Sequence, residues 1–235
     1  MDPFELPSAA IGYPVTLHQV RELRLIGRAD LAYWRHQLRG EALAPADVEG
    51  GAEAVLAVTS ARWLGRRFCE CSLSVSISRD PAGSTRDGLY LAQAYSDVAA
   101  FAWVERNLFG SPYRHAQIAF DPAPAWGVEV QGPTGEAVMA RMGPAALVGI
   151  ASLAEDWRGP LVLPRLPGRS AGQYFRARLA GTARYAPFVH NRDGFRIDEG
   201  APDSAWAVLN ASGFEPHTWR VCEDALHART TSFAR

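Results

Sequence analysis

The segment "RFCECSLSVSIS", Arg67 to Ser78, alternates strictly between two sets of side chains. Side chains repeat at every second residue in a β-strand and at a longer period in a helix, so this pattern excludes a helix. One face of the strand would carry Cys69, Cys71, Leu73, Val75 and Ile77, and the other would carry Phe68, Glu70 and the serines. The segment therefore predicts a long strand with one apolar and one polar face.

Further strand signals follow along the chain. Residues 80–88, "DPAGSTRDG", are rich in the Pro and Gly that form turns, and Leu89–Tyr95 fits the antiparallel partner of the first strand. Trp126–Met142 predicts a second hairpin, and Gln173–Tyr185 alternates apolar residues with arginines. Antiparallel strands therefore dominate the predicted structure.

Two segments combine helical spacing of apolar residues with recognisable helix ends. Asp30–Leu38 begins at an aspartate that can cap a helix, and Val98–Phe109 lies between the capping residue type Asp97 and the helix-ending Gly110. A third helix is predicted over Thr218–Arg229. The sequence shows no internal repeat and no long linker, so we expect one domain, residues 1–235, of the α+β class.

The charge balance favours a small-molecule partner. The formal net charge is -1, whereas binding to nucleic acid or to anionic lipid depends on clustered positive charge, so we expect neither partner. The start, "MDPFELPSAA", lacks the basic and apolar regions of a signal peptide, and no apolar run is long enough to span a membrane. We expect a cytoplasmic protein, and a homo-oligomer stays an open alternative.

The absence of lysine restricts the chemistry. All 24 basic residues are arginine, so no side-chain amine is present to form a Schiff base with a ketone or with pyridoxal phosphate. We expect an enzyme without a cofactor. The three cysteines, an odd number, predict free thiols rather than a disulfide framework. Cys69 and Cys71 share the apolar face and no histidine stands at ligand spacing, so we expect no metal site.

The order of elements around Tyr90–Ile118, "YLAQAYSDVAAFAWVERNLFGSPYRHAQI", resembles the acetoacetate decarboxylase family. In that family, the helix after a hairpin ends in a Gly or aromatic residue, a Pro and two lysines, and an acidic residue on an earlier strand faces the cavity. The segments "FCE" upstream and "LVLPRLPG" downstream also resemble the family. The resemblance implies a cone-shaped antiparallel barrel with a buried small-molecule cavity.

This chain departs from that family where the family's chemistry takes place. Tyr113 and Arg114 stand at the positions of the two lysines, and neither a phenol nor a guanidinium forms an imine. The resemblance then implies Glu70 as general acid or base, Arg114 as the cation that holds an anion or enolate, and Tyr113 as a hydrogen-bond donor. His115 and Arg21 are implied as ligand-binding residues.

We therefore expect dehydration, cyclisation or enolisation of a small carbonyl or carboxylate compound, in a role such as specialised metabolism. Other interpretations stay open. Glu70 fits a solvent-facing strand residue, and Tyr113 and Arg114 fit a surface loop with an arginine near a helix C-terminus. The cavity also fits a non-catalytic binding module.

A serine hydrolase is the rival from another class. "GRSAG", residues 168–172, matches the nucleophile elbow around Ser170, and Asp198 or Asp203 followed by His217 would complete a triad in the required chain order. The elbow requires a helix after the serine, whereas the following segment alternates as a strand does. The sequence therefore favours the barrel over the hydrolase.

Overall fold

The computed structural model describes residues 3–4, 12–63, 65–122, 126–144, 146–165, 172–200 and 204–234. The helices are α1 (Leu31–Leu38), α2 (Ala99–Leu108), α3 (Ala205–Ala211) and the short 3-10 helix η1 (Arg39–Glu41). The strands are β1 (Val15–Ala29), β2 (Ala44–Pro45), β3 (Asp47–Val48), β4 (Gly51–Trp63), β5 (Arg66–Ser78), β6 (Gly88–Ser96), β7 (Tyr113–His115), β8 (Gln117–Asp121), β9 (Gly127–Gln131), β10 (Ala137–Arg141), β11 (Ser152–Leu163), β12 (Gln173–Pro187), β13 (Gly194–Asp198), β14 (Glu215–Arg229) and β15 (Phe233–Ala234).

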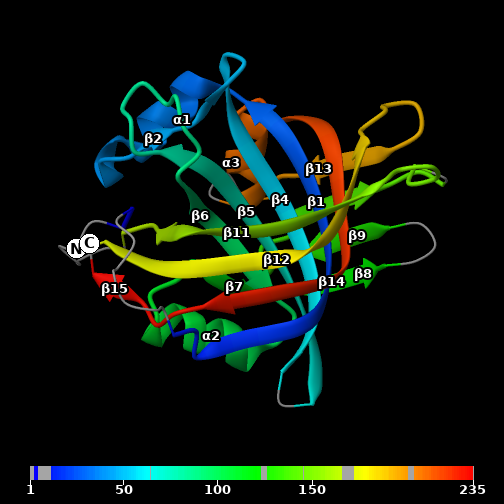
Figure 1. The fold of residues 1–235 in the computed structure, drawn as a ribbon, viewed down its shortest axis with the longest axis horizontal. Helices are drawn as coiled ribbons and strands as arrows, with labels where there is room; N and C mark the ends of the chain where they lie inside the picture. Colours follow the sequence, from blue (N-terminus) through cyan, green and yellow to red (C-terminus); the bar gives the residue numbers. More distant parts are fainter. Residues whose placement is uncertain are drawn as a thin grey trace.

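Most of the strands form one large curled sheet. Its order is β2-β5-β4-β1-β14-β12-β11-β6-β7, and β6 also pairs with β5, which brings the sheet round on itself (Figure 1). The β11–β6 pairing is short, with Leu161 opposite Leu89 and Val162 opposite Tyr90, so the barrel is incompletely closed. The prediction of an antiparallel, strand-rich α+β fold of barrel type is confirmed as this curled sheet.

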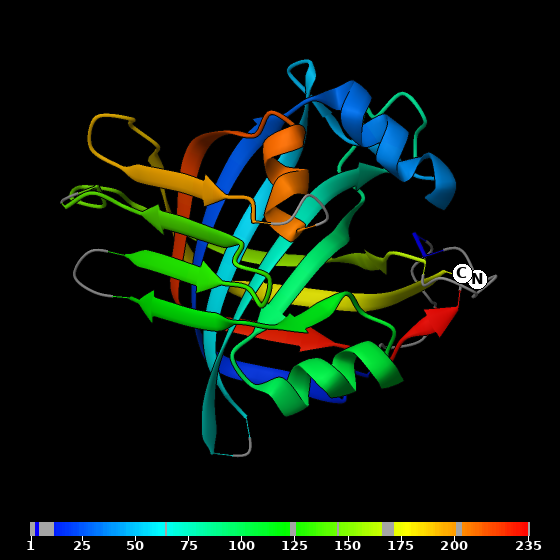
Figure 2. The same ribbon diagram turned by 180° about the vertical axis from the view of Figure 1, so that it is seen from behind.

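A second, four-stranded sheet, in the order β13-β10-β9-β8, covers the outside of the curl. Its Val128, Val130 and Val138 share a buried core with Cys71 and Leu73 of β5. Figure 1 shows β11 and β12 in front of β5 and β6, and Figure 2 shows the second sheet in front on the opposite side. The apolar face predicted for β5 is therefore its outer face.

The opposite side of β5, which carries Glu70, Ser72 and Ser74, we call the inner face. Ser74 and Ser76 are buried although they are polar. The reason is that the sheet curls over this face, so both faces of β5 are covered. Sequence alternation alone predicts only one buried face, because it carries no information about curvature.

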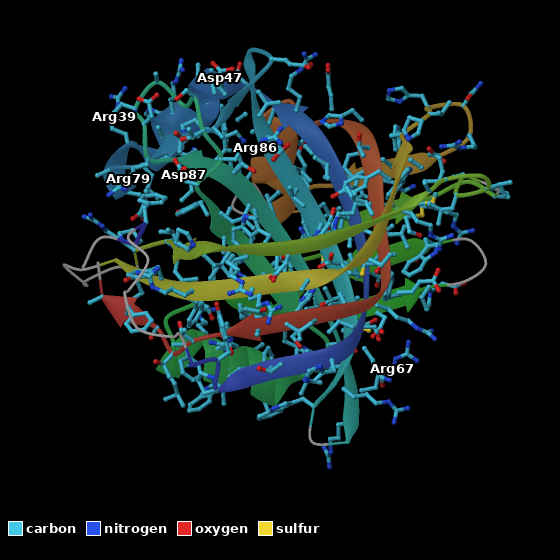
Figure 3. All side chains as sticks on the ribbon, viewed as in Figure 1. Arg39, Asp47, Arg67, Arg79, Arg86 and Asp87 are labelled. Carbon is cyan, nitrogen blue, oxygen red and sulfur yellow. The ribbon has the colours of Figure 1, made fainter. Side chains whose placement is uncertain are left out.

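The β5–β6 hairpin confirms the predicted turn. The Asp87 carboxylate accepts a hydrogen bond from the Arg79 backbone N–H at 2.7 Å. Figure 3 shows these two residues together at one end of β5, close to α1, with Arg67 at the far end of the strand. The register shifts between Leu73 and Ser74, and beyond this shift Glu70 lies opposite Ser96.

The helix predictions are partly correct. Asp30 caps α1 by accepting a hydrogen bond from the Tyr33 backbone N–H, as expected. α2 is confirmed as a helix, but the N-cap residue is Val98 and not Asp97. The Asp97 carboxylate instead accepts a hydrogen bond from the backbone N–H of Cys69 at 2.8 Å, which ties the start of α2 to β5.

The helix predicted over Thr218–Arg229 is wrong, because this segment belongs to β14. β14 pairs with β1 on one side and with β12 on the other, so its backbone groups are satisfied by neighbouring strands. The sequence also gave no sign of α3, which Ser204 caps by accepting a hydrogen bond from the Ala207 N–H. None of the helices in the described ranges is long and apolar enough to cross a membrane.

Candidate functional site

Tyr113 and Glu70 meet on the inner face of the curled sheet. The Tyr113 hydroxyl donates a hydrogen bond to the Glu70 carboxyl, with 2.8 Å between the oxygens. Gly110 has a φ of +67°, a left-handed conformation that suits glycine, and it ends α2. The chain then turns at Pro112 into β7, which pairs in parallel with β6. This turn presents Tyr113 directly behind the helix end.

The Glu70 carboxyl has an unusual protonation equilibrium. Burial raises its pKa from the ordinary 4.5 to about 7, because desolvation disfavours the charged form. The hydrogen bond from Tyr113 and the charge of Arg229 act in the opposite direction, and the charge of Glu105 adds to the rise. Burial, followed by the charges of Glu70 and Glu105, likewise raises the pKa of Tyr113 well above its usual range.

Glu105 and Arg229 form the charged pair beside Tyr113 and Glu70. Glu105, on the buried side of α2, is 2% exposed and forms an ion pair with Arg229 at the end of β14. The Arg229 guanidinium lies 4.4 Å from the ring centre of Phe175 and 5.0 Å from that of Phe109. The Ser111 hydroxyl donates a second hydrogen bond to Glu105 at 3.1 Å. A fixed cation is thus held between aromatic rings close to the Glu70 carboxyl.

Neither Glu105 nor Arg229 was predicted as a site residue. Glu105 follows Ala102 by three positions in α2, and these two residues are the buried ones of that helix. A carboxylate on the apolar stripe of a helix is the signal that could have revealed it, because buried charges require partners. The sequence held no corresponding signal for Arg229, because a helix over Thr218–Arg229 would not place it next to α2 or β5.

A second charged cluster lies on the same inner face. Glu22 of β1 stands opposite Thr59 of β4, and Thr59 stands opposite Glu70, so the two carboxylates share one cross-strand row. Glu22 is 1% exposed and pairs with Arg24, Arg220 and His227, with 2.9 Å to the His227 Nε2.

The neighbouring basic groups decide the ionisation of Glu22. Burial acts to raise the pKa of Glu22, but the charges of Arg24, His227 and Arg220 outweigh it and hold the pKa well below the ordinary value. Arg220 also pairs with Glu155, which extends the cluster to β11. The inner face therefore holds two carboxyls with opposite shifts. The pKa of Glu22 is lowered, so Glu22 stays charged, and the pKa of Glu70 is raised to about 7.

No family model and no curated protein matches this sequence. Solved structures do. An acetoacetate decarboxylase structure superposes with a TM-score of 0.62 at 14% identity, covering 95% of this chain and 91% of that chain. An acetoacetate decarboxylase-like enzyme from Sphingomonas wittichii RW1 gives 0.61 at 14% identity, covering 96% and 94%. The acetoacetate decarboxylase of Legionella pneumophila gives 0.62 at 13% identity, covering 100% and 94%.

This chain has the acetoacetate decarboxylase-like fold. The likeness runs through nearly the whole length of both chains, and it agrees with the resemblance seen in the sequence around Tyr90–Ile118. At 13 to 14% identity it establishes the architecture. A fold of this kind is compatible with an enzyme or with a module that binds small molecules.

Within the acetoacetate decarboxylase-like fold, the predicted site residues separate into groups. Tyr113 and Glu70 are brought together. Arg114 is the next residue of β7, and alternation turns its side chain to the other side, where it lies beside Tyr95. The structure does not bring Arg114 to Glu70. His115 is exposed at the end of β7, opposite Ser96.

Arg21 lies apart from these residues. It is exposed and lines a pocket of about 480 Å³ together with Met142, Arg184 and Glu223. Its neighbours in β1, Glu22 and Leu23, show the alternation: Leu23 belongs to the outer core and Glu22 to the inner cluster. The arginine that β1 does supply to the inner face is Arg24. A ligand-binding role for Arg21 stays a prediction.

The hydrolase alternative is not tested, because Ser170 and Asp203 lie outside the described residues. Of the other two triad candidates, Asp198 pairs with Arg196 at 3.2 Å, and the His217 Nδ1 lies 2.8 Å from the Thr218 hydroxyl. Metal-ligating side chains do not gather in threes anywhere in the described part of the chain.

Proposed function

We propose that this chain is an enzyme that performs acid–base chemistry on a small carbonyl or carboxylate compound, without an imine intermediate. The observation that carries the proposal is the Glu70 carboxyl. Its pKa is raised to about 7, and it accepts a hydrogen bond from the Tyr113 hydroxyl at 2.8 Å. A general acid or base works best when its pKa is close to the working pH, since both protonation states are then populated. An ordinary surface glutamate does not meet this condition.

The neighbouring groups have complementary roles in this proposal. As a base, the Glu70 carboxylate removes a proton from the carbon next to a carbonyl, and the electron pair moves to the carbonyl oxygen as an enolate. The neutral Tyr113 phenol donates a hydrogen bond, and the Arg229 charge stabilises the developing anion. The sequence suggested Arg114 for the cationic role. We now assign it to Arg229, because Arg229 acts on both Glu70 and Tyr113.

The related structures suggest the class of substrate. Their names refer to acetoacetate, a small β-keto acid. The same class suits a carboxyl base with a nearby fixed cation, so we propose small keto acids and ketones as substrates. Because the chain contains no lysine, the reaction would proceed through an enolate or a protonated carbonyl instead of an imine. Enolisation, dehydration and cyclisation all begin with such a step.

Hydrogen–deuterium exchange tests the proposal directly. Acetoacetate and a panel of small keto acids and ketones would be incubated with the protein in D2O, and loss of the proton next to the carbonyl would be followed by proton NMR. We expect exchange above the buffer rate for at least one compound. The Glu70→Gln variant should lose this exchange by a factor of roughly 100 or more, as removal of a general base does.

Two controls accompany this experiment. Glu129→Gln changes an exposed glutamate on β9 and should leave exchange unchanged. Sodium borohydride added with acetoacetate should leave every internal residue unlabelled, because no lysine is present. If a panel compound binds but its exchange stays at the buffer rate with both wild-type protein and Glu70→Gln, the non-catalytic binding module is the better description.

A further inference from the structure

A pocket of about 280 Å³ lies over β6 and β7, bordered by residues of α1, α2 and α3. We call it the helix-side pocket, and its lining includes Trp34, Gln37, Tyr90, Gln93, Arg106 and Arg114. Figure 2 shows the three helices on the side of the molecule that faces the viewer. The volume is slightly below the usual range for ligand sites, roughly 300 to 1,000 Å³, so only a small ligand would fit.

The lining of the helix-side pocket carries positive charge without a compensating carboxylate. Arg106 and Arg114 both line it, and none of the described lining residues is Asp or Glu. Within the described chain, neither guanidinium takes part in an ion pair. The Glu105 carboxylate lies behind Ser111, where it is already paired with Arg229. An anion entering the pocket therefore meets two cations whose charge is not neutralised there.

The remaining walls suit an apolar molecule with one polar end. The Trp34 ring is 1% exposed, and its indole N–H has no hydrogen-bond partner among the described residues. Gln37 and Gln93 add amide groups, and Tyr90 adds a second aromatic surface. A guanidinium recognises a carboxylate through two parallel hydrogen bonds, which a neutral amide cannot reproduce. We infer that the helix-side pocket binds a small carboxylate with an aromatic or apolar body.

The helix-side pocket adjoins the site of the proposed function, because Tyr113 lines the pocket and is also hydrogen-bonded to Glu70. The inference itself depends on the two arginines of the pocket and not on acid–base chemistry at Glu70. The Tyr113 hydroxyl is hydrogen-bonded to Glu70 on the inner face, whereas Arg114, the next residue of β7, lies beside Tyr95, a residue of the outer core. Binding in the helix-side pocket consequently does not need a charged Glu70. The two experiments can fail separately, because one measures proton exchange at a substrate carbon and the other measures binding of a carboxylate.

Calorimetric titration with benzoate, an aromatic carboxylate, tests the inference, with benzamide as its neutral counterpart. We expect benzoate to bind more tightly than benzamide, and its affinity to fall as salt is added. Arg114→Met should weaken benzoate by about 10- to 150-fold, the range of a charge-assisted hydrogen bond, and should leave benzamide unchanged. Arg106 is exposed, so Arg106→Met should have a smaller effect.

An NMR signal from the pocket wall shows whether benzoate binds in the helix-side pocket. In a spectrum of protein labelled with ¹⁵N, the Trp34 indole signal, assigned through Trp34→Phe, should move as benzoate is added. Glu129→Gln, which changes an exposed glutamate outside the pocket lining, serves as the matched control and should bind benzoate like the wild type. If Arg114→Met does not fold, Arg114→Lys keeps the charge and should retain part of the affinity. Equal affinities for benzoate and benzamide, or an Arg114→Met protein that binds benzoate normally, would overturn the inference.

Discussion

The hydroxyl of Tyr113 donates a hydrogen bond to the carboxyl of Glu70 at 2.8 Å, although the two residues are 43 positions apart in the chain. A hydrogen bond of this kind favours the ionised carboxylate, whereas burial favours the neutral acid. The pKa of Glu70, about 7, is thus the outcome of opposing influences that come from different elements of the fold. Each influence can be removed separately.

Tyr113→Phe removes the hydrogen bond and leaves the ring in place. We expect the pKa of Glu70 to rise further above about 7, because the charged form loses its donor while burial is unchanged. Titration of the ¹³C-labelled glutamate side chains by NMR measures this shift. The free energy of unfolding at neutral pH should change by no more than about 1.5 kcal/mol. An unchanged or lower pKa would show that the hydrogen bond does not control this carboxyl.

Glu105→Gln and Arg229→Met should move the pKa of Glu70 in opposite directions. Removing the Glu105 charge removes a repulsion and leaves Arg229 unneutralised, so the pKa falls. Removing the Arg229 charge takes away an attraction and leaves Glu105 unneutralised, so the pKa rises. The same NMR titration applies to both variants. Shifts of the same sign in both would contradict the electrostatic arrangement described for this pair.

Glu70 should make the protein less stable as the pH rises. The Glu70 carboxyl has a pKa of 4.5 in the unfolded chain and of about 7 in the folded protein, so the folded state binds more protons between these pH values. The stabilising contribution is complete below the unfolded pKa and is lost as the pH rises through the folded pKa. Relative to Glu70→Gln, the wild type should lose about 2 to 3 kcal/mol between about pH 5 and about pH 8.

Urea unfolding of both proteins at several pH values measures this difference. Glu129→Gln is the matched control, since it changes an exposed glutamate on β9. Its stability should follow that of the wild type at every pH. A wild type that gains stability relative to Glu70→Gln as the pH rises would mean that the folded pKa of Glu70 is lowered instead.

Glu22→Gln should destabilise the fold. Glu22 is 1% exposed and neutralises Arg24 and Arg220, so the variant leaves buried cations without their partner. We expect a loss of about 3 to 5 kcal/mol near neutral pH. Because the folded pKa of Glu22 is lowered, its contribution is present above the ordinary value of 4.5 and is lost as the pH falls through the folded pKa.

Glu223→Gln provides the comparison for Glu22→Gln. Glu223 lies on the neighbouring strand β14 and pairs with Arg184, but its side chain is 63% exposed. Loss of an exposed pair should cost less than about 1 kcal/mol. Thermal and urea unfolding of the two variants side by side checks the contrast. Equal losses would indicate that Glu22 is not as buried as described.

Much of the strand content was predictable from the sequence. The alternation of Arg67–Ser78 is a local property, and it correctly indicated the apolar face of β5. The turn over residues 80–88 and the helix ends at Asp30 and Gly110 also depend on near neighbours, because turns and caps involve groups only a few residues apart. The absence of lysine is a fact of the sequence that no fold can alter.

The tertiary structure alone decided the remaining features. Thr218–Arg229 has helical spacing but lies in a strand, since β1 and β12 offer it hydrogen-bond partners on both sides. The sequence could not show that Arg229 pairs with Glu105, 124 residues away, or that Arg24 reaches the inner face while Arg21 does not. These outcomes depend on sheet order, register and curvature. The pKa of Glu70 depends on all three, because the groups that act on it, Tyr113, Glu105 and Arg229, come from β7, α2 and β14.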